Sequence, residues 1–287
     1  MDSSYSNAQR DSVKQEYEDK LKQNGGFCAH QFETDFGYGE KELESVPQDA
    51  VDSSFGCANP LSMGAFKPGD RVVDLGCGAG MDVILAAQRV GVNGKVIGVD
   101  MTGDMVEKAR RNIAATGVED IAEVRKGVIE SLPIESNSVD WVISNCVVSL
   151  SPDKEQVFAE VFRVLKPGGK MLLTDQVMQP LPGLLRALIA LKSPAAAKAL
   201  DRDRYLAVVI QSGLAEVTLR SELVYDAAML RSLVLGELNI RRGFWSALLH
   251  LDGSQVLSHT LKPLLTPAVK YAANKVSSIK VYAEKPQ

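Results

Sequence analysis

The sequence predicts an α/β fold in which a mostly parallel sheet carries helices on both faces. Between about residues 51 and 180, short apolar runs of strand length alternate with amphipathic runs of helix length, as in parallel sheets built from strand–helix–strand units. The first apolar run leads into three glycines spaced two apart, Gly76, Gly78 and Gly80. The second run ends in a carboxylate, Asp100, twenty residues past Gly80. These features together predict the fold class.

The strands are predicted from apolar runs bounded by turn residues. They are residues 72–75, 94–100, 122–127, 138–145, 170–175 and 215–223, with 278–284 as a last, antiparallel strand. The helices are predicted from amphipathic spacing. They are residues 82–90, 104–116, 154–165 and 202–212, with a further helix near 12–23.

The chain divides into three parts. Residues 1–50 are polar and are interpreted as an N-terminal cap segment, and residues 51–180 form the ligand-binding core. Residues 181–287 complete the fold, with two insertions at 181–201 and 224–276 that are rich in leucine and alanine at helical spacing. Insertions after the fifth and sixth strands lie at the carboxyl edge of the sheet, where ligands bind. They are therefore expected to shape the substrate pocket, although packing on the domain as plain core is the alternative.

Composition indicates an α/β enzyme and sets limits on its partners. At 287 residues and 45% hydrophobic content, the chain can bury a large core. The net charge of -4 gives no nucleic-acid footprint. We expect a cytoplasmic protein, because the N-terminal residues 1–23 lack the apolar core of a signal peptide and no run of membrane-spanning length occurs. Four cysteines in such a chain indicate thiol chemistry or core packing before a disulfide framework.

The glycine turn predicts a site for a nucleotide-like cofactor. Glycine accepts positive φ and lets a ligand approach the main chain, while the next helix presents unpaired amides. An acidic side chain at the end of the second strand can accept both hydroxyls of a ribose. The GxGxG spacing differs from the GxGxxG of dinucleotide folds. These residues alone allow either NAD or S-adenosylmethionine.

Five motifs together resemble the class I S-adenosylmethionine-dependent methyltransferases over about residues 60–180. The motifs are DLGCGAG from Asp74, VIGVDMT from Val96, GVIESLP from Gly127, VDWVISN from Val139 and RVLKPGGKMLLTD from Arg163. The resemblance implies a Rossmann-like fold with a mostly parallel seven-stranded sheet, and S-adenosyl-L-methionine as cofactor. It also implies the cofactor-binding residues: Asp74, Gly76, Gly78 and Gly80 at the methionine part, Asp100 at the ribose, Ile129 and Glu130 beside the adenine, together with Met101 and Asn145.

The cysteines are the clue to the methyl acceptor. Cys77 lies inside the glycine turn, where a small residue is needed, and is interpreted as packing. Cys57 lies in a loop before the first strand, and Cys146 follows Asn145 at the carboxyl end of the fourth strand, where the transferred methyl would point in this fold. Two thiols aimed at a methyl donor favour a soft, thiophilic acceptor. The alternative is that both are buried packing residues, as free cysteines often are.

The segments 54–60 and 143–154 give a closer resemblance, to the arsenite methyltransferases, over about residues 28–180. In that family, cysteines at the places of Cys57 and Cys146 bind trivalent arsenic. Cys28 matches an upstream cysteine that can pair with the loop cysteine during redox cycling, and a small thiol would serve as reductant. The resemblance implies that the lone pair of arsenic attacks the sulfonium methyl in line, so that the protein supplies mainly orientation.

One departure from that family bears on the substrate. Family members carry a further cysteine downstream of the fifth strand, and this chain has no cysteine after Cys146. Arsenite would then need a hydroxide, a water or a small thiol as third ligand, whereas methylarsenite needs only two thiols. We therefore expect methylarsenite to be methylated better than arsenite. Two further hypotheses remain: methylation of carbon, oxygen, nitrogen or sulfur in an apolar small organic molecule, and a binding module that holds the cofactor without turnover.

Overall fold

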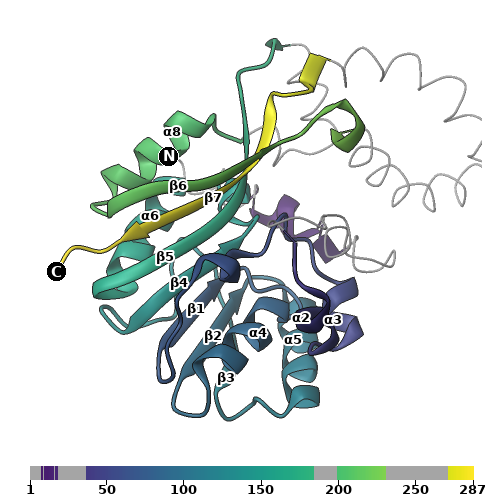
Figure 1. Ribbon diagram of the computed structural model, residues 1–287, viewed down its shortest axis with the longest axis vertical. Coiled ribbons are helices and arrows are strands. Elements are labelled where there is room, and N and C mark those ends of the chain that lie inside the picture. The colour runs from purple at the N-terminus through teal and green to yellow at the C-terminus, as the bar shows by residue number, and fades with distance from the viewer. Residues whose placement is uncertain (1–7, 9, 16, 19–36, 184–198, 231–270) are drawn as a thin grey trace, which may run out of the picture.

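The computed structural model describes most of the chain, and in it a seven-stranded sheet has the strand order β3-β2-β1-β4-β5-β7-β6 (Figure 1). The predicted α/β fold with seven strands is confirmed. The described residues are 8, 10–15, 17–18, 37–183, 199–230 and 271–287.

The first five strands pair in parallel, and β7 pairs antiparallel with both β5 and β6. Strand β1 lies between β2 and β4, so the strand order reverses there. In open α/β sheets, ligands bind outside the carboxyl ends of the strands at such a reversal. The strands are β1 (Arg71–Leu75), β2 (Lys95–Asp100), β3 (Ala122–Lys126), β4 (Val139–Asn145), β5 (Leu165–Met178), β6 (Ala215–Val224) and β7 (Val276–Glu284).

The main helices begin and end within about two residues of their predicted limits. They are α4 (Met81–Val90), α5 (Gly103–Thr116), α6 (Lys154–Val164) and α8 (Arg202–Gln211). Short elements that the sequence did not predict are α2 (Glu40–Glu44), α3 (Gln48–Asp52) and the 3₁₀ helices η1 (Pro60–Met63) and η2 (Val148–Leu150). Of the helix expected near residues 12–23, residues 12–15, 17 and 18 are described and are helical.

Strand β5 is longer than predicted, because the glycine turn at residues 166–169 lies inside the strand. Leu165 pairs with Val139, and the register with β4 then shifts before Lys170 meets Trp141. Gly168 has a φ of 74° and its amide donates to the carbonyl of Lys285. The turn is therefore an irregularity within β5 and does not mark the start of the strand.

Alternate residues of the strands build two cores, one on each face of the sheet. On one face, Val73 and Leu75 of β1 pack in the core that contains Phe158 of α6 and Tyr205 of α8. On the other face, Val72 packs in the core of α4 and α5. The predicted covering of both faces is confirmed. No helix in the described part of the chain is long and apolar enough to cross a membrane.

The two insertions predicted at residues 181–201 and 224–276 lie largely outside the described residues. The described portions end at residue 183 and at residue 230, and resume at 199 and 271. Strand β7 begins at Val276, two residues before the predicted start, and pairs with β5 along its whole length. Its first residues therefore reach the carboxyl edge of β5.

Candidate active site

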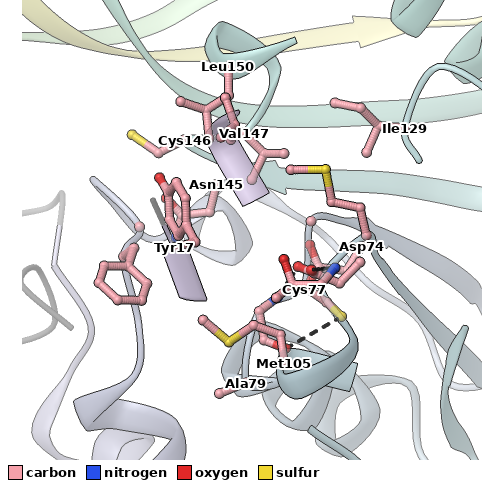
Figure 2. Close-up of a pocket in the computed structure, with 18 of the residues that line it drawn as sticks. Tyr17, Asp74, Cys77, Ala79, Met105, Ile129, Asn145, Cys146, Val147 and Leu150 are labelled. Carbon is pink, nitrogen blue, oxygen red and sulfur yellow. Dashed lines mark hydrogen bonds between the residues drawn. The ribbon is translucent and has the colours of Figure 1, made fainter. Parts of the chain in front are cut away.

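A cavity opens at the carboxyl ends of β1, β2 and β4 (Figure 2). The glycine turn after β1 forms one wall, and Asp100 and Met101 after β2 continue it. The segments 127–130 and 145–147 line the cavity farther along the sheet. The strand order thus gathers nearly all the predicted cofactor residues around one space.

The three glycines of the turn have positive φ values of 66°, 51° and 89° at Gly76, Gly78 and Gly80. A Cβ at Gly78 would meet nothing within 4 Å, so this residue presents bare backbone to the cavity. A Cβ at Gly76 would overlap Val147. Gly80 caps α4 and is not among the residues that line the cavity. The turn leaves ligand space at Gly78 and uses the other two glycines for packing and for the helix start.

Asp100 is held by main-chain amides. The amide of Gly78 donates to one carboxylate oxygen at 3.0 Å, and the amide of Thr102 donates to the other at 2.8 Å. Burial raises the pKa of Asp100, and these amides oppose the rise. A carboxylate has about four lone-pair sites, so each oxygen can still accept a ligand hydroxyl.

Asp74 and Asp82 add two further buried carboxyl groups to the cavity wall. Burial raises the pKa of Asp74 well above its usual range, and the charges of Asp82 and Asp100 add to this. Burial also raises the pKa of Asp82 to about 6, against hydrogen bonds from Tyr38 and Asn145. A cation placed among these groups would favour their charged forms. Asp82 was not predicted as a site residue. Its position, as an acidic residue in the first helical turn after the glycines, is the signal that could have identified it.

The other predicted cofactor residues also line the cavity. Met101 follows Asp100, and Ile129 and Glu130 lie on the segment after β3. The carboxylate of Glu130 accepts a hydrogen bond from the hydroxyl of Ser151 at 2.6 Å. This bond ties the segment after β3 to the segment after β4.

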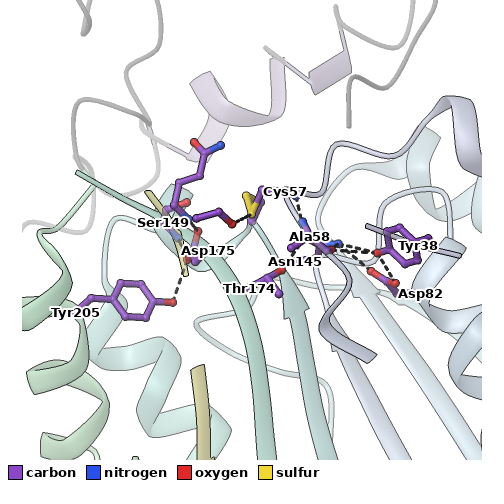
Figure 3. The surroundings of a disulfide bond; sticks show 12 residues. Tyr38, Cys57, Ala58, Asp82, Asn145, Ser149, Thr174, Asp175 and Tyr205 are labelled. Atoms are coloured by element: carbon purple, nitrogen blue, oxygen red, sulfur yellow. Dashed lines mark hydrogen bonds between the residues drawn. A yellow bond between two sulfur atoms is a disulfide. The ribbon is translucent and has the colours of Figure 1, made fainter. Parts of the chain in front are cut away.

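The structure joins Cys57 and Cys146 in a disulfide with a Cα–Cα distance of 5.8 Å (Figure 3). The resemblance implied that these two cysteines bind arsenic as thiols and that Cys28 can pair with Cys57 during redox cycling. Cys28 lies outside the described residues, and the partner of Cys57 in the structure is Cys146. The reason is topological, since the loop before β1 lies over the end of the adjacent strand β4. Both predicted acceptor-binding cysteines are thus within reach of one another.

The two sulfur-bearing residues differ in exposure. Cys146 is partly exposed and lines the cavity, with a φ of 61° that is uncommon for a residue other than glycine. Cys57 is 1% exposed and lies behind the cavity wall formed by Phe55 and Gly56. Cys77 is a free, buried cysteine whose pKa is raised by burial and by the charge of Asp100. Cys77 therefore fits the packing role predicted for it.

Asn145 fixes the Cys57 loop to the end of β4. Its amide oxygen accepts hydrogen bonds from the main-chain amide of Cys57 at 2.9 Å and from the hydroxyl of Thr174 at 2.8 Å. Its amide nitrogen donates to the carbonyl of Ala58 at 2.6 Å and to the hydroxyl oxygen of Tyr38 at 2.9 Å. Asn145 lines the cavity, as predicted for a cofactor residue. Its side-chain hydrogen bonds, however, serve to position the cysteine loop.

The N-terminal helix contributes residues that the sequence analysis did not propose for the site. Arg10, Val13 and Tyr17 line the cavity, and the ring of Tyr17 packs edge-on against Phe55 with centroids 5.2 Å apart. Residues at this spacing share one face of a helix. That periodicity was the signal that could have identified them. Among the described residues, no three His, Cys, Asp or Glu side chains are grouped so that they could hold a metal ion.

Comparison with known proteins decides the family. The sequence profile of a family described as a methyltransferase domain matches residues 66–217, which is more than half of the chain. The chain belongs to the methyltransferase domain family. The predicted family is thereby confirmed. The match covers β1 to the start of β6, and so includes the glycine turn, Asp100 and Cys146.

The relatives of this methyltransferase domain confirm the resemblance to arsenite methyltransferases. An arsenite methyltransferase of Halobacterium salinarum is 47% identical over 158 residues, which cover 54% of this chain and 40% of that protein. The match therefore spans less than half of that relative's length. The crystal structure of an arsenic(III) S-adenosylmethionine methyltransferase from Chlamydomonas reinhardtii aligns with a TM-score of 0.59 and 27% identity, covering 86% of this chain and 72% of that one. That protein is an S-adenosylmethionine methyltransferase, which agrees with the predicted cofactor.

The fold by itself does not define the reaction. The structure of a [4+2]-cyclase, SpnF, aligns with a TM-score of 0.61 at 15% identity, over 95% of this chain and 92% of that one. Likeness at that identity shows the fold alone. The identity of the methyl acceptor depends instead on the residues at the cavity.

Proposed function

We propose that this chain is an S-adenosylmethionine-dependent methyltransferase that acts on trivalent arsenic held by Cys57 and Cys146. The observation that supports the proposal is that Cys146 lines the cavity that contains the glycine turn and Asp100, and that the buried sulfur of Cys57 is bonded to it. Two thiolates in reach of each other suit a soft metalloid. Cys57 and Cys146 are 89 positions apart in the sequence, so it is the fold that brings their sulfurs together.

The residues that line the cavity match the chemical groups of the cofactor. Bare backbone at Gly78 leaves room for the methionine part, and Asp74 and Asp82 offer carboxylates to its ammonium and sulfonium charges. Asp100 would accept from the ribose hydroxyls, and Ile129 would lie beside the adenine. When bound, the cofactor supplies an electrophilic methyl group on a sulfonium. The chain's own residues orient the acceptor and exclude water.

The substrate requires both cysteines in the reduced form. A small thiol would reduce the Cys57–Cys146 disulfide, two thiols being oxidised to a disulfide as the two cysteines become thiols. Methylarsenite would then exchange its two hydroxyl groups for the two cysteine sulfurs, releasing two waters. Arsenic held in this way keeps its lone pair for the methyl group. The need for reduced thiols is why we also propose a reducing, cytoplasmic environment.

Methylation assays with purified, reduced protein test this proposal. We expect turnover of methylarsenite, weaker turnover of arsenite, and loss of both in Cys57→Ser and in Cys146→Ser. Cys77→Ser is the comparison variant for arsenical binding: Cys77 lies inside the glycine turn, so this variant should still bind one methylarsenite per chain, whereas Cys57→Ser and Cys146→Ser should not. Full methylarsenite turnover by Cys57→Ser would contradict the proposed ligand pair, and a preference for arsenite would contradict the two-thiol argument.

An apolar organic acceptor is the second candidate, favoured by the apolar side chains at the cavity. Val13, Tyr17, Phe55, Val147 and Leu150 line it close to Cys146. Such an acceptor would not need sulfur ligands, so Cys57→Ala would leave its methylation intact. Release of S-adenosylhomocysteine across a panel of organic substrates and arsenicals separates the two functions, and no release with any of them would favour a binding module.

A further inference from the structure

A serine on the last strand contacts the sulfur of Cys57. Ser278 lies on β7, where it pairs with Gln176 of β5 and Leu223 of β6. Its side chain is 0% exposed, and its hydroxyl donates a hydrogen bond to the Sγ atom of Cys57 at 3.3 Å. The two residues are 221 positions apart in the sequence. No motif of the sequence analysis included Ser278.

A buried hydroxyl at this position has a cost unless it is hydrogen-bonded. The next residues of β7 on the opposite face, Ile279 and Val281, are apolar and pack in the core of α6 and α8. On the face of Ser278, Thr174 bonds to Asn145, and the ammonium of Lys280 donates to the hydroxyl of Ser62 at 2.9 Å. This face of β5 and β7 therefore carries polar side chains, and their hydrogen bonds help to hold the loop from Cys57 to Ser62.

Cys57 is fixed at both its main chain and its sulfur. Asn145 accepts from its amide at 2.9 Å, and Ser278 donates to its Sγ at 3.3 Å. A disulfide or thiol sulfur is only a weak acceptor. A hydrogen bond from a hydroxyl to an ionised acceptor is roughly twice as strong as one to a neutral acceptor. The contact therefore stabilises the sulfur most when Cys57 is a thiolate.

We propose that Ser278 is a positioning residue that directs the sulfur of Cys57 and favours its thiolate form, the form in which it would bind the acceptor. The consequence for turnover rests on the proposed arsenical methylation. The effect on the thiol does not, because it depends only on the Ser278–Cys57 contact.

The thiol is tested in a background that leaves Cys57 as the single cysteine, with Cys28, Cys77 and Cys146 each changed to serine. The measurement is the pH midpoint of thiolate ultraviolet absorbance. Removing a hydrogen bond to a charged group should raise the midpoint in Ser278→Ala by about one pH unit. The ionisable groups that bond to the loop from Cys57 to Ser62 are Tyr38, Glu42, Arg89 and Lys280, and none of them is changed by this variant.

Ser277→Ala is the matched control, because its side chain is on the opposite face of the same strand. It should keep the parent midpoint. Equal midpoints in Ser278→Ala and Ser277→Ala would overturn the proposal. Should Ser278→Ala fail to fold, Ser278→Thr retains the hydroxyl and is expected to keep the parent midpoint, and a rise of about one unit in that variant would likewise overturn it.

Turnover is measured separately, in the protein with all four cysteines. If the proposed function holds, Ser278→Ala should lose about tenfold in methylarsenite turnover near neutral pH and recover part of it at higher pH, where the thiolate forms without help. Absence of turnover in the parent together with a shifted midpoint would refute the arsenical function and leave the positioning role of Ser278 supported.

Discussion

At the scale of single residues, one amide and one carboxyl group organise the site. Asn145 bonds the Cys57 loop through both its oxygen and its nitrogen, and Asp82 accepts hydrogen bonds from the Tyr38 hydroxyl at 2.7 Å and from Asn145 at 3.2 Å. Local sequence could not reveal either role, because the partners lie between 44 and 88 positions away. What the sequence did show was that Asn145 ends a predicted strand and that Asp82 begins a predicted helix.

Asn145→Asp tests the first of these roles. The substitution replaces an amide donor with an acceptor that faces the Ala58 carbonyl and the carboxylate of Asp82. We expect the free energy of unfolding to fall by about 1 to 3 kcal/mol, because in this partly buried position the donated hydrogen bonds to Ala58 and Asp82 are lost and two carboxylates face each other. Urea denaturation measures it. Asn93→Asp, at an exposed position, should change stability by less than about 0.5 kcal/mol. A stability equal to that of the parent would show that the network around Asn145 is not structural.

The pKa of Asp82, raised by burial to about 6 in the ligand-free protein, predicts how cofactor binding depends on pH. The charged form is the one that attracts the cationic cofactor, so the affinity should weaken as the pH falls through about 6. Binding between about pH 4 and 6 should release a proton. Calorimetry in two buffers of different ionisation enthalpy measures this.

Asp82→Asn should weaken binding at pH 7 and remove that inflection. Asp104→Asn, in the first turn of α5 and outside the cavity lining, is the control. The pH dependence of stability has the opposite direction. The pKa of Asp82 is higher in the folded protein than in the unfolded chain. The contribution of Asp82 to the free energy of unfolding is therefore present at low pH and is lost as the pH rises through about 6. An affinity that stays constant from pH 5 to 7 would contradict the role of Asp82.

At the scale of elements, the loop between α3 and η1 is shaped by contact with β4. A Cβ built on Gly56 would overlap the side-chain amide of Asn145, so only glycine lets the loop pass this close. The sequence predicted the parallel strands and their helices because periodicity is local. It missed the irregularity in β5, because that depends on pairing with Val139 and Lys285.

Gly56→Ala should push the loop away from Asn145 and prevent the Cys57–Cys146 disulfide from forming. The number of free thiols in the oxidised, denatured protein should rise by two relative to the parent. Gly39→Ala is the control, because its Cβ would meet its nearest neighbour at an ordinary 3.8 Å. An unchanged thiol count in Gly56→Ala would show that the loop adapts.

At the scale of the whole molecule, the strand order decides where the chemistry lies. Because β4 is the neighbour of β1, Cys146 at the end of β4 lines the same cavity as the glycine turn and is bonded to the loop that carries Cys57. Strand β7, inserted between β5 and β6, brings Ser278 to the same edge. The site thus draws on segments from most of the chain.

Reducing the disulfide should lower the free energy of unfolding by about 3 to 5 kcal/mol, because an 89-residue separation is then no longer closed in the unfolded chain. Methylarsenite should restore much of this stability to the reduced protein by bridging the two sulfurs, and should not affect the oxidised protein. Thermal unfolding with and without reductant measures both. Cys146→Ser should abolish both effects, and stabilisation of that variant by methylarsenite would contradict the bridging.

The sequence by itself determined the side of the cavity that is proposed to bind the methyl donor. The glycine turn, Asp100 and the strands that carry them are defined by residues close together in the chain, so local spacing was sufficient. Only the tertiary structure decided the geometry of the side that is proposed to hold the acceptor. The pairing of Cys57 with Cys146, the carboxyl group of Asp82 in the cavity and the contact of Ser278 all join distant residues. Such contacts depend on strand order and loop packing, which no local pattern encodes.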